Sequence, residues 1–241
     1  MPIANLPTEN DISSVVTGIP AGGKVLVVID YEPALAGEME AIGSPVLDQM
    51  VSSSHPNLSF ISTSPNGSAL AGRLIANTEI NTGAQYLNLG YLPGGAAGVL
   101  GFLEKPAEIV PTSGVTSFSD YAAIVVLTDH AESGRVWVEQ LQNRRQIDTA
   151  LANQPLLMIA SAQAGPLLQP YVLSGQINGM ISGLSDAARY EVAKNIQLGI
   201  ARSYWDAFGV GLMMAIALII IGSLWSLYTG IRARRVEAEQ G

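Results

Sequence analysis

The segment at residues 207–231 constrains the fold of this chain more than any other feature, because it carries no charged residue over its whole length. It reads AFGVGLMMAIALIIIGSLWSLYTGI, with Asp206 before it and Arg232 after it. An α-helix rises about 1.5 Å per residue, so this segment would extend roughly 37 Å and cross a hydrocarbon core of about 30 Å with some tilt. We therefore predict one transmembrane helix here rather than a helix of a soluble core.

Aromatic side chains flank the predicted span at both ends, as they do at the two interfaces of a bilayer. Trp205 and Trp225 would lie about 30 Å apart along the helix axis, which matches the thickness of the hydrocarbon core. The other aromatic residues at the two ends are Tyr204, Phe208 and Tyr228. Their placement supports a membrane helix.

Basic residues after the span predict its orientation. Arg232, Arg234 and Arg235 follow it closely, and basic flanks remain in the cytoplasm. We therefore expect a cytoplasmic tail and an extracytoplasmic head at the cell membrane. The first residues, MPIANLPTENDISS, lack the basic and apolar segments of a signal peptide. We thus expect an upstream signal or second span beyond this sequence; the alternative is a tail-anchored protein with a cytosolic head.

Composition excludes several kinds of chemistry. The chain has no cysteine, which rules out disulfides, thiol nucleophiles and cysteine-ligated metal sites. It has 12 basic and 20 acidic residues and no concentrated basic segment in the head, so nucleic acid is not an expected partner. His55 and His130 are too few for a histidine-rich metal site. We therefore predict no metal and no other cofactor.

Short β-branched segments alternate with segments of helical periodicity before the span. Strands alternating with helices form βαβ units, so we predict a Rossmann-like α/β fold with a mainly parallel sheet of five to six strands and flanking helices. The predicted strands are residues 24–31, 58–63, 86–92, 121–128 and 155–161, with a sixth at 177–181. The predicted helices are residues 33–52, 68–76, 96–103, 131–142, 166–173 and 187–200, the last with Ser185 as its N-cap.

This pattern divides the chain into five parts. Residues 1–23 form a polar leader, and residues 24–186 form the α/β head. Residues 187–206 form a juxtamembrane helix that continues into the span, which would hold the head close to the bilayer. The span at residues 207–231 and the short tail at residues 232–241 complete the chain.

Polar residues gather where the predicted strands end. In open parallel sheets, ligands bind beyond the carboxyl ends of the strands, at a switch in strand order. The candidate ligand-binding residues at these ends are Asp30, Glu32, Ser64, Gly94, Gly95, Asp129, His130 and Gln163.

Three chemical roles compete for these residues. The three carboxylates could bind a divalent cation through their oxygen atoms. His130 could act as a general base, with Ser64 or Ser161 as the nucleophile. The role that we favour is structural, because Asp129 or His130 stands where the helix beginning at residue 131 needs an N-cap. We therefore assign no catalytic residue.

The segment at residues 88–98, NLGYLPGGAAG, combines a strand, a glycine-rich turn and a helix start. Backbone N–H groups at such a turn can hold an anion. The spacing matches neither GxGxxG nor a phosphate-binding loop, and the GxSxG motif of hydrolases is absent from the sequence. We therefore interpret Gly94 and Gly95 as a tight turn that allows close helix packing, with an anion site as the alternative.

Several segments resemble an uncharacterised group of bacterial membrane-anchored α/β proteins. The resemblance covers most of the chain from Lys24 to the span and includes VLVVIDYEPALAGEM, ISTSPNGSALAGRLI, YLNLGYLPGGAAG, IVVLTDHAESGRVWVEQ and YWDAFGVGL. It implies an additional apolar segment upstream. It implies no activity and no catalytic residue, because none is established for the group.

These expectations favour a non-catalytic accessory or scaffold subunit of a membrane protein complex. Its partners would be the lipid bilayer and another integral membrane protein. One alternative is a membrane-tethered hydrolase or metal-dependent enzyme with its site at the strand ends. Another is a solute-binding receptor domain, which would pass its signal to a partner because the predicted cytoplasmic tail is short.

Overall fold

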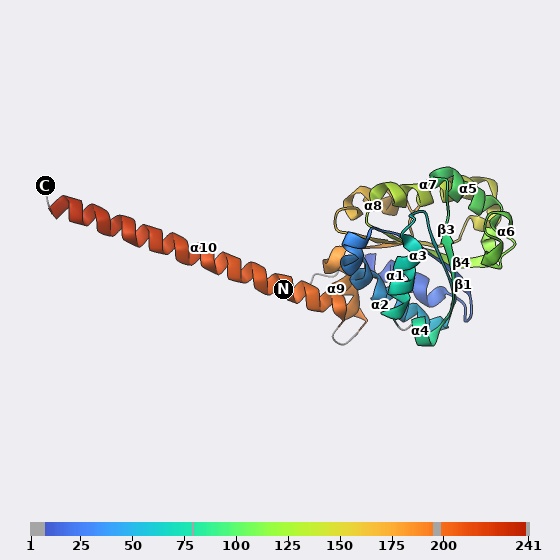
Figure 1. The fold of residues 1–241 in the computed structure, drawn as a ribbon, viewed down its shortest axis with the longest axis horizontal. Coiled ribbons are helices and arrows are strands. Elements are labelled where there is room, and N and C mark those ends of the chain that lie inside the picture. Colours follow the sequence, from blue (N-terminus) through green and yellow to red (C-terminus); the bar gives the residue numbers. More distant parts are fainter. Residues whose placement is uncertain (1–7, 79, 195–198, 240–241) are drawn as a thin grey trace.

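Six segments rich in aliphatic and β-branched residues form one parallel sheet in the computed structural model, which describes residues 8–78, 80–194 and 199–239 (Figure 1). The strand order is β3-β2-β1-β4-β5-β6, and each neighbouring pair is parallel. The order changes direction between β1 and β4, so the switch point lies there. The strands are β1 (Lys24–Asp30), β2 (Asn57–Ser62), β3 (Gln85–Tyr91), β4 (Tyr121–Thr128), β5 (Leu156–Ala160) and β6 (Gly179–Ser182).

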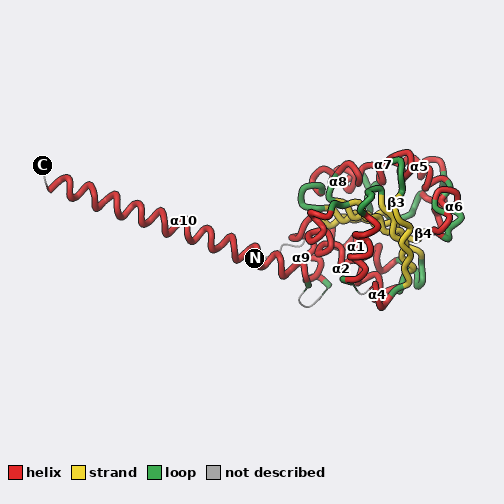
Figure 2. Tube along the Cα trace, in the orientation of Figure 1, coloured by secondary structure: helices red, strands yellow, loops and turns green. Residues whose placement is uncertain are grey.

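Helices cover both faces of this sheet, which confirms the predicted Rossmann-like α/β fold (Figure 2). Successive strand residues point to opposite faces, so Val25 and Val27 join one core and Leu26 and Val28 join the other. The first core lies under α1 (Thr8–Gly18), α2 (Ala36–Ser54), α3 (Gly67–Ala76), α4 (Ile80–Gly83) and α9 (Gly183–Ala193). The second lies under α5 (Gly95–Glu104), α7 (Ala131–Ile147) and α8 (Gly165–Leu173), and α6 (Pro106–Ile109) packs on α5. Short 3-10 turns occupy Pro33–Leu35, Pro111–Ser113, Phe118–Asp120 and Thr149–Leu151.

The predicted polar leader contains a helix of the head. Ile12 and Val16 of α1 are buried in the first core, and α1 packs against α2 and β6. Two apolar residues four positions apart lie on one face of a helix, so a largely polar segment can still dock. The head therefore begins before residue 24.

The helix predicted to run without interruption from residue 187 into the span consists of two helices. α9 begins at Gly183, so Ser185 lies inside its first turn and is not the N-cap. Ser182 occupies the N-cap position and makes no side-chain capping bond. α10 (Ile200–Glu239) then begins separately. The predicted juxtamembrane helix is thus divided between a helix packed on the head and the start of α10.

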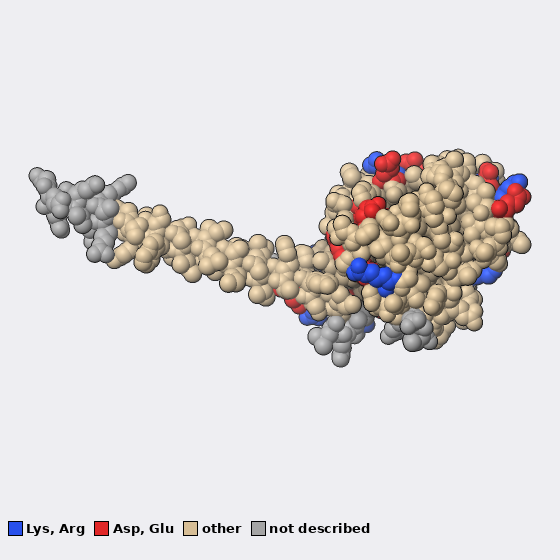
Figure 3. All heavy atoms as spheres, viewed as in Figure 1, with Lys and Arg blue, Asp and Glu red and all other residues tan. Residues whose placement is uncertain are grey.

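α10 extends away from the head as a single long helix (Figure 1). Among the residues that the structure describes, one helix, Ile200–Ile231, is long and apolar enough to cross a membrane, and its most apolar 18-residue window has a mean hydropathy of 2.4. Only 6% of its apolar window is buried, whereas a soluble core helix would be largely covered. Figure 3 shows charged side chains on the head and an uncharged surface along most of the described part of α10. α10 is therefore a candidate membrane span, in agreement with the sequence.

Candidate functional site

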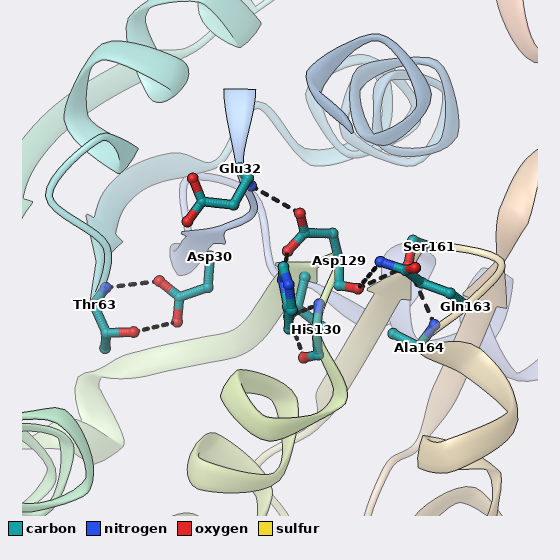
Figure 4. A network of polar contacts seen from close by, with 9 residues as sticks. Asp30, Glu32, Thr63, Asp129, His130, Ser161, Gln163 and Ala164 are labelled. Carbon is teal, nitrogen blue, oxygen red and sulfur yellow. Dashed lines mark hydrogen bonds and ion pairs between the residues drawn. The ribbon is translucent and has the colours of Figure 1, made fainter. Parts of the chain in front are cut away.

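The candidate site lies at the carboxyl ends of β1 and β4, where the strand order switches (Figure 4). Asp30 is the last residue of β1 and pairs with Thr128, the last residue of β4. Asp129 and His130 follow directly. The sheet therefore brings the carboxyl ends of its two central strands, β1 and β4, side by side.

Asp30 is a buried carboxylate whose two oxygen atoms accept four hydrogen bonds. The backbone N–H of Thr63 donates over 2.6 Å and its hydroxyl over 2.7 Å. The Ser62 hydroxyl donates over 3.1 Å, and the indole N–H of Trp137 donates over 3.0 Å. Hydrogen bonds to a charged acceptor compensate the cost of burying it. Asp30 therefore connects β1 to β2 and α7, and does not present a free carboxylate to a ligand.

Asp129 is also buried, with an exposed fraction of 1%. One oxygen accepts the backbone N–H of Glu32 over 2.9 Å, and the other lies 2.5 Å from Nδ1 of His130. His130 stands at the expected N-cap position, but neither side chain makes the expected capping bond. His130 occupies the N-cap position of α7 without a side-chain capping bond, and the Asp129 carboxylate stabilises an N–H group in the loop after β1 instead.

The loop after β5 is hydrogen-bonded to the backbone of Asp129. The hydroxyl of Ser161 donates to the carbonyl oxygen of Asp129 over 2.9 Å, and the side-chain amide of Gln163 donates to the same oxygen over 3.1 Å. The Ser161 oxygen also accepts a backbone N–H near the start of α8 over 3.2 Å. Glu38 on α2 accepts the backbone N–H of Ala162 over 3.0 Å. The polar network thus joins the loops that follow β1, β4 and β5.

Ser64 and the glycine pair follow β2 and β3. The backbone N–H of Ser64 donates to the Ser62 hydroxyl over 2.9 Å, so Ser64 lies beside the Asp30 cluster. Gly94 and Gly95 have φ angles of 99° and 54° and form the turn into α5. These angles favour glycine and support the tight-turn interpretation. Because β3 lies two strands from β1, roughly 10 Å away, the glycine pair is outside the network.

Tyr31 follows Asp30 and joins the core on the face of α2 and α3. Burial, and to a smaller extent the charge of Glu40, raise the pKa of its hydroxyl above the usual value. Glu40 forms an ion pair with Arg73 on α3, with 2.9 Å between Nε and Oε1. The Tyr31 hydroxyl is therefore neutral near pH 7 and belongs to the packed interior.

The geometry is unlike a metal centre or a complete nucleophile–base arrangement. Within the described residues, no group of three His, Asp or Glu side chains could hold a metal ion. In the same part of the chain, no hydrogen bond joins the His130 ring to Ser64 or Ser161. The Asp129–His130 pair nonetheless orients an imidazole that is 59% exposed. That pair is the arrangement most suited to proton transfer at the site.

Sequence reasoning did not identify Trp137 or Glu38 as members of this network. Trp137 lies 107 residues from Asp30 in the chain, so no local motif reports their contact. The available signal is chemical, because a buried tryptophan N–H usually needs an acceptor. A search for that acceptor among the strand-end carboxylates would have found Asp30.

The fold and the site define a Rossmann-like α/β head joined to a C-terminal candidate membrane helix. Comparison of the chain with protein-family models, with curated proteins and with solved structures finds no match. The resemblance to bacterial membrane-anchored α/β proteins therefore stays a prediction.

Proposed function

We propose that the protein is a non-catalytic accessory or scaffold subunit, anchored in the cell membrane by α10 and bound through its head to another integral membrane protein. The observation that carries this proposal is that the buried carboxylates at the switch point are already hydrogen-bonded within the chain. Asp30 accepts four hydrogen bonds from its own chain, and both Asp129 oxygens are also engaged. The place where Rossmann-like folds usually bind ligands is therefore held together by its own polar groups.

The exposed edge strand β3 also supports a protein partner. Its sequence, QYLNLGY, has no charge, and Tyr86, Leu87 and Tyr91 are each more than 40% exposed. Soluble proteins usually protect an edge strand with charges or a covering element, because its free N–H and C=O groups can pair with another chain. An uncharged apolar edge thus suits a surface that a partner covers.

The membrane topology is tested by protease added to intact cells or right-side-out vesicles. We expect the protease to remove the head, because Arg232, Arg234 and Arg235 should keep the tail in the cytoplasm. Changing all three arginines to glutamate should scramble insertion. A fully protected head together with an accessible tail would reverse the proposed orientation.

Partner binding is tested by crosslinking in native membranes followed by affinity purification. We expect the parent to recover an integral membrane protein and Leu87→Lys to lose it, because a charge on the edge strand opposes pairing. Ile109→Lys is the control, because Ile109 is 47% exposed but lies on α6 rather than β3. Equal recovery with both variants would exclude the β3 edge as the binding surface.

The Asp129–His130 pair supports a second candidate, a membrane-tethered hydrolase in which His130 is the general base. A buried carboxylate that orients an exposed imidazole is part of such machinery. The test is a panel of ester and amide substrates presented to the parent and to His130→Ala. Turnover that His130→Ala abolishes without a change in melting temperature would establish the enzyme and refute the non-catalytic subunit.

A further inference from the structure

The junction between the head and α10 is built around a fully buried carboxylate. Glu191 lies in the last turn of α9 and has an exposed fraction of 0%. Its two oxygen atoms accept the backbone N–H groups of Ala201 and Arg202, over 3.1 Å and 2.8 Å. These N–H groups belong to the first turn of α10, where no carbonyl within the helix can accept them. A side chain of the head thus caps the candidate membrane helix.

Close packing accompanies this cap. A Cβ atom at Gly199 would lie 2.0 Å from Cδ of Glu191, so the chain passes the carboxylate at a distance that only glycine permits. Ala201 is itself fully buried and joins the first core of the head. The start of α10 is therefore packed against the head as well as hydrogen-bonded to it.

α9 is in turn fixed to the rest of the head. Tyr190 is fully buried, and its hydroxyl contacts the side-chain amide of Gln49 on α2. The ammonium group of Lys194, at the end of α9, contacts the hydroxyl of Ser13 on α1. The carboxylate that caps α10 is thus carried by a helix with contacts to two other helices of the head.

The buried carboxylate distinguishes this junction from a flexible linker between head and span. Removing a carboxylate from water is costly unless charge-assisted hydrogen bonds replace the lost hydration. Here the positive end of the α10 dipole and its two N–H groups supply that replacement. A flexible linker between head and span would need neither the buried charge nor the glycine beside it.

We propose that Glu191 is a positioning residue that fixes α10 in one orientation relative to the head, so that head and candidate membrane span move as one rigid body. The head then presents the same face at a constant angle to the bilayer. The β3 edge would be held at a set position for a partner. The joint itself does not depend on the identity of any partner.

Double electron–electron resonance on the full chain in lipid nanodiscs tests this joint directly. The chain has no cysteine, so Ala97→Cys on α5 and Leu212→Cys on α10 place two spin labels without background labelling. The parent pair should give one narrow distance peak. Glu191→Ala and Gly199→Ala should each lose that narrow peak, because the first removes the acceptors and the second forces the chain away from them.

Two control variants separate the cap from other effects. Arg202→Ala keeps the backbone N–H, and the Arg202 side chain is about half exposed and faces Asp206 at 3.7 Å, so the narrow peak should remain. Gly211→Ala adds a methyl group where no atom lies within 4 Å and should also leave the peak unchanged. Loss of the peak in both controls would assign the effect to general perturbation of α10 and overturn the inference.

Three results would overturn the inference outright. The first is a broad distance distribution in the parent, and the second is a narrow distance peak in both Glu191→Ala and Gly199→Ala. The third applies where circular dichroism shows that those two variants do not fold, and is a narrow distance peak in Glu191→Gln. The glutamine keeps the size of Glu191 but turns an amide N–H₂ toward one of the two donors. Because nanodiscs contain no partner protein, these results are independent of whether the proposed association with a membrane protein holds.

Discussion

Replacement of Asp30 by alanine tests whether the switch point is structural. The carboxylate accepts four hydrogen bonds, but two of its donors have alternatives. The Ser62 hydroxyl can donate to the carbonyl oxygen of Ile29, which it contacts at 2.5 Å, and the partly exposed Thr63 hydroxyl can rotate toward water. The backbone N–H of Thr63 and the indole N–H of Trp137 are fixed in place and would lose their acceptor.

These two fixed donors set the expected size of the effect. A buried donor without a partner costs about 1–3 kcal/mol, so Asp30→Ala should lower the free energy of unfolding by about 2–6 kcal/mol. Small domains have a total stability of about 5–15 kcal/mol, so this loss is a large part of it. Trp137→Phe removes one of the donors. The double variant Asp30→Ala/Trp137→Phe should therefore be less destabilised than the sum of the two single variants, by about 1–3 kcal/mol.

The measurement is urea unfolding of the full chain in detergent micelles, followed by circular dichroism. Asp148→Ala is the control, because the Asp148 carboxylate accepts one exposed backbone N–H over 3.0 Å at the start of a 3-10 turn. Loss of such a cap should cost about 1 kcal/mol. If Asp30→Ala were no more destabilising than Asp148→Ala, or if the effects of Asp30 and Trp137 were additive, the structural role of Asp30 would be refuted.

Three further outcomes are expected. Asp129→Ala should lower the melting temperature more than His130→Ala, because Asp129 is buried and its loss leaves a backbone N–H unpaired, whereas His130 is mostly exposed; equal shifts in thermal circular dichroism would contradict this. Gly67→Ala should strongly destabilise the head, because the added Cβ would lie 1.9 Å from a serine hydroxyl of β2. Gly72→Ala in the same helix adds its Cβ to open space and should be neutral or stabilise by up to about 1 kcal/mol. The urea midpoints of the two variants should therefore differ, and similar midpoints would argue against this packing. Backbone N–H groups of the preceding turn lower the pKa of Asp120, so the ionised carboxylate stabilises the folded state fully above its unfolded-state pKa. This stabilisation is lost as the pH falls through the lower folded-state pKa, and Asp120→Asn should remove that loss from the stability–pH curve below about pH 4. An unchanged fall in stability at acid pH in Asp120→Asn would refute the prediction.

The elements that sequence predicted well are those with a local cause. Buried parallel strands need continuous aliphatic and β-branched residues, and the predicted strand at residues 121–128 coincides with β4 (Tyr121–Thr128). The candidate membrane helix is likewise a matter of length and hydropathy within one segment, so a long apolar helix in the region of α10 was predicted from the local sequence. The Rossmann-like class followed from the alternation of these elements along the chain.

The errors arose where a residue's role depends on a distant part of the chain. α1 looked like a leader because its polar residues outnumber the two side chains that dock it. The predicted continuous helix into the span consists of two helices, and Glu191 of the first caps the second. The apolar residues of α1 are at helical spacing, but this does not indicate which elements they pack against, and the Glu191 cap has no local sequence signal; both features depend on which helices become neighbours.

The network at the switch point was settled by tertiary structure alone. Asp30 and Asp129 were correctly placed at the ends of two strands, but their acceptor roles depend on Trp137, 107 residues from Asp30, and on Glu32, 97 residues from Asp129. The local sequence determines which segments become strands and which form a long apolar helix. The hydrogen-bond partners of a buried carboxylate are determined by which loops the folded sheet brings together, and that depends on contacts between residues far apart in the chain.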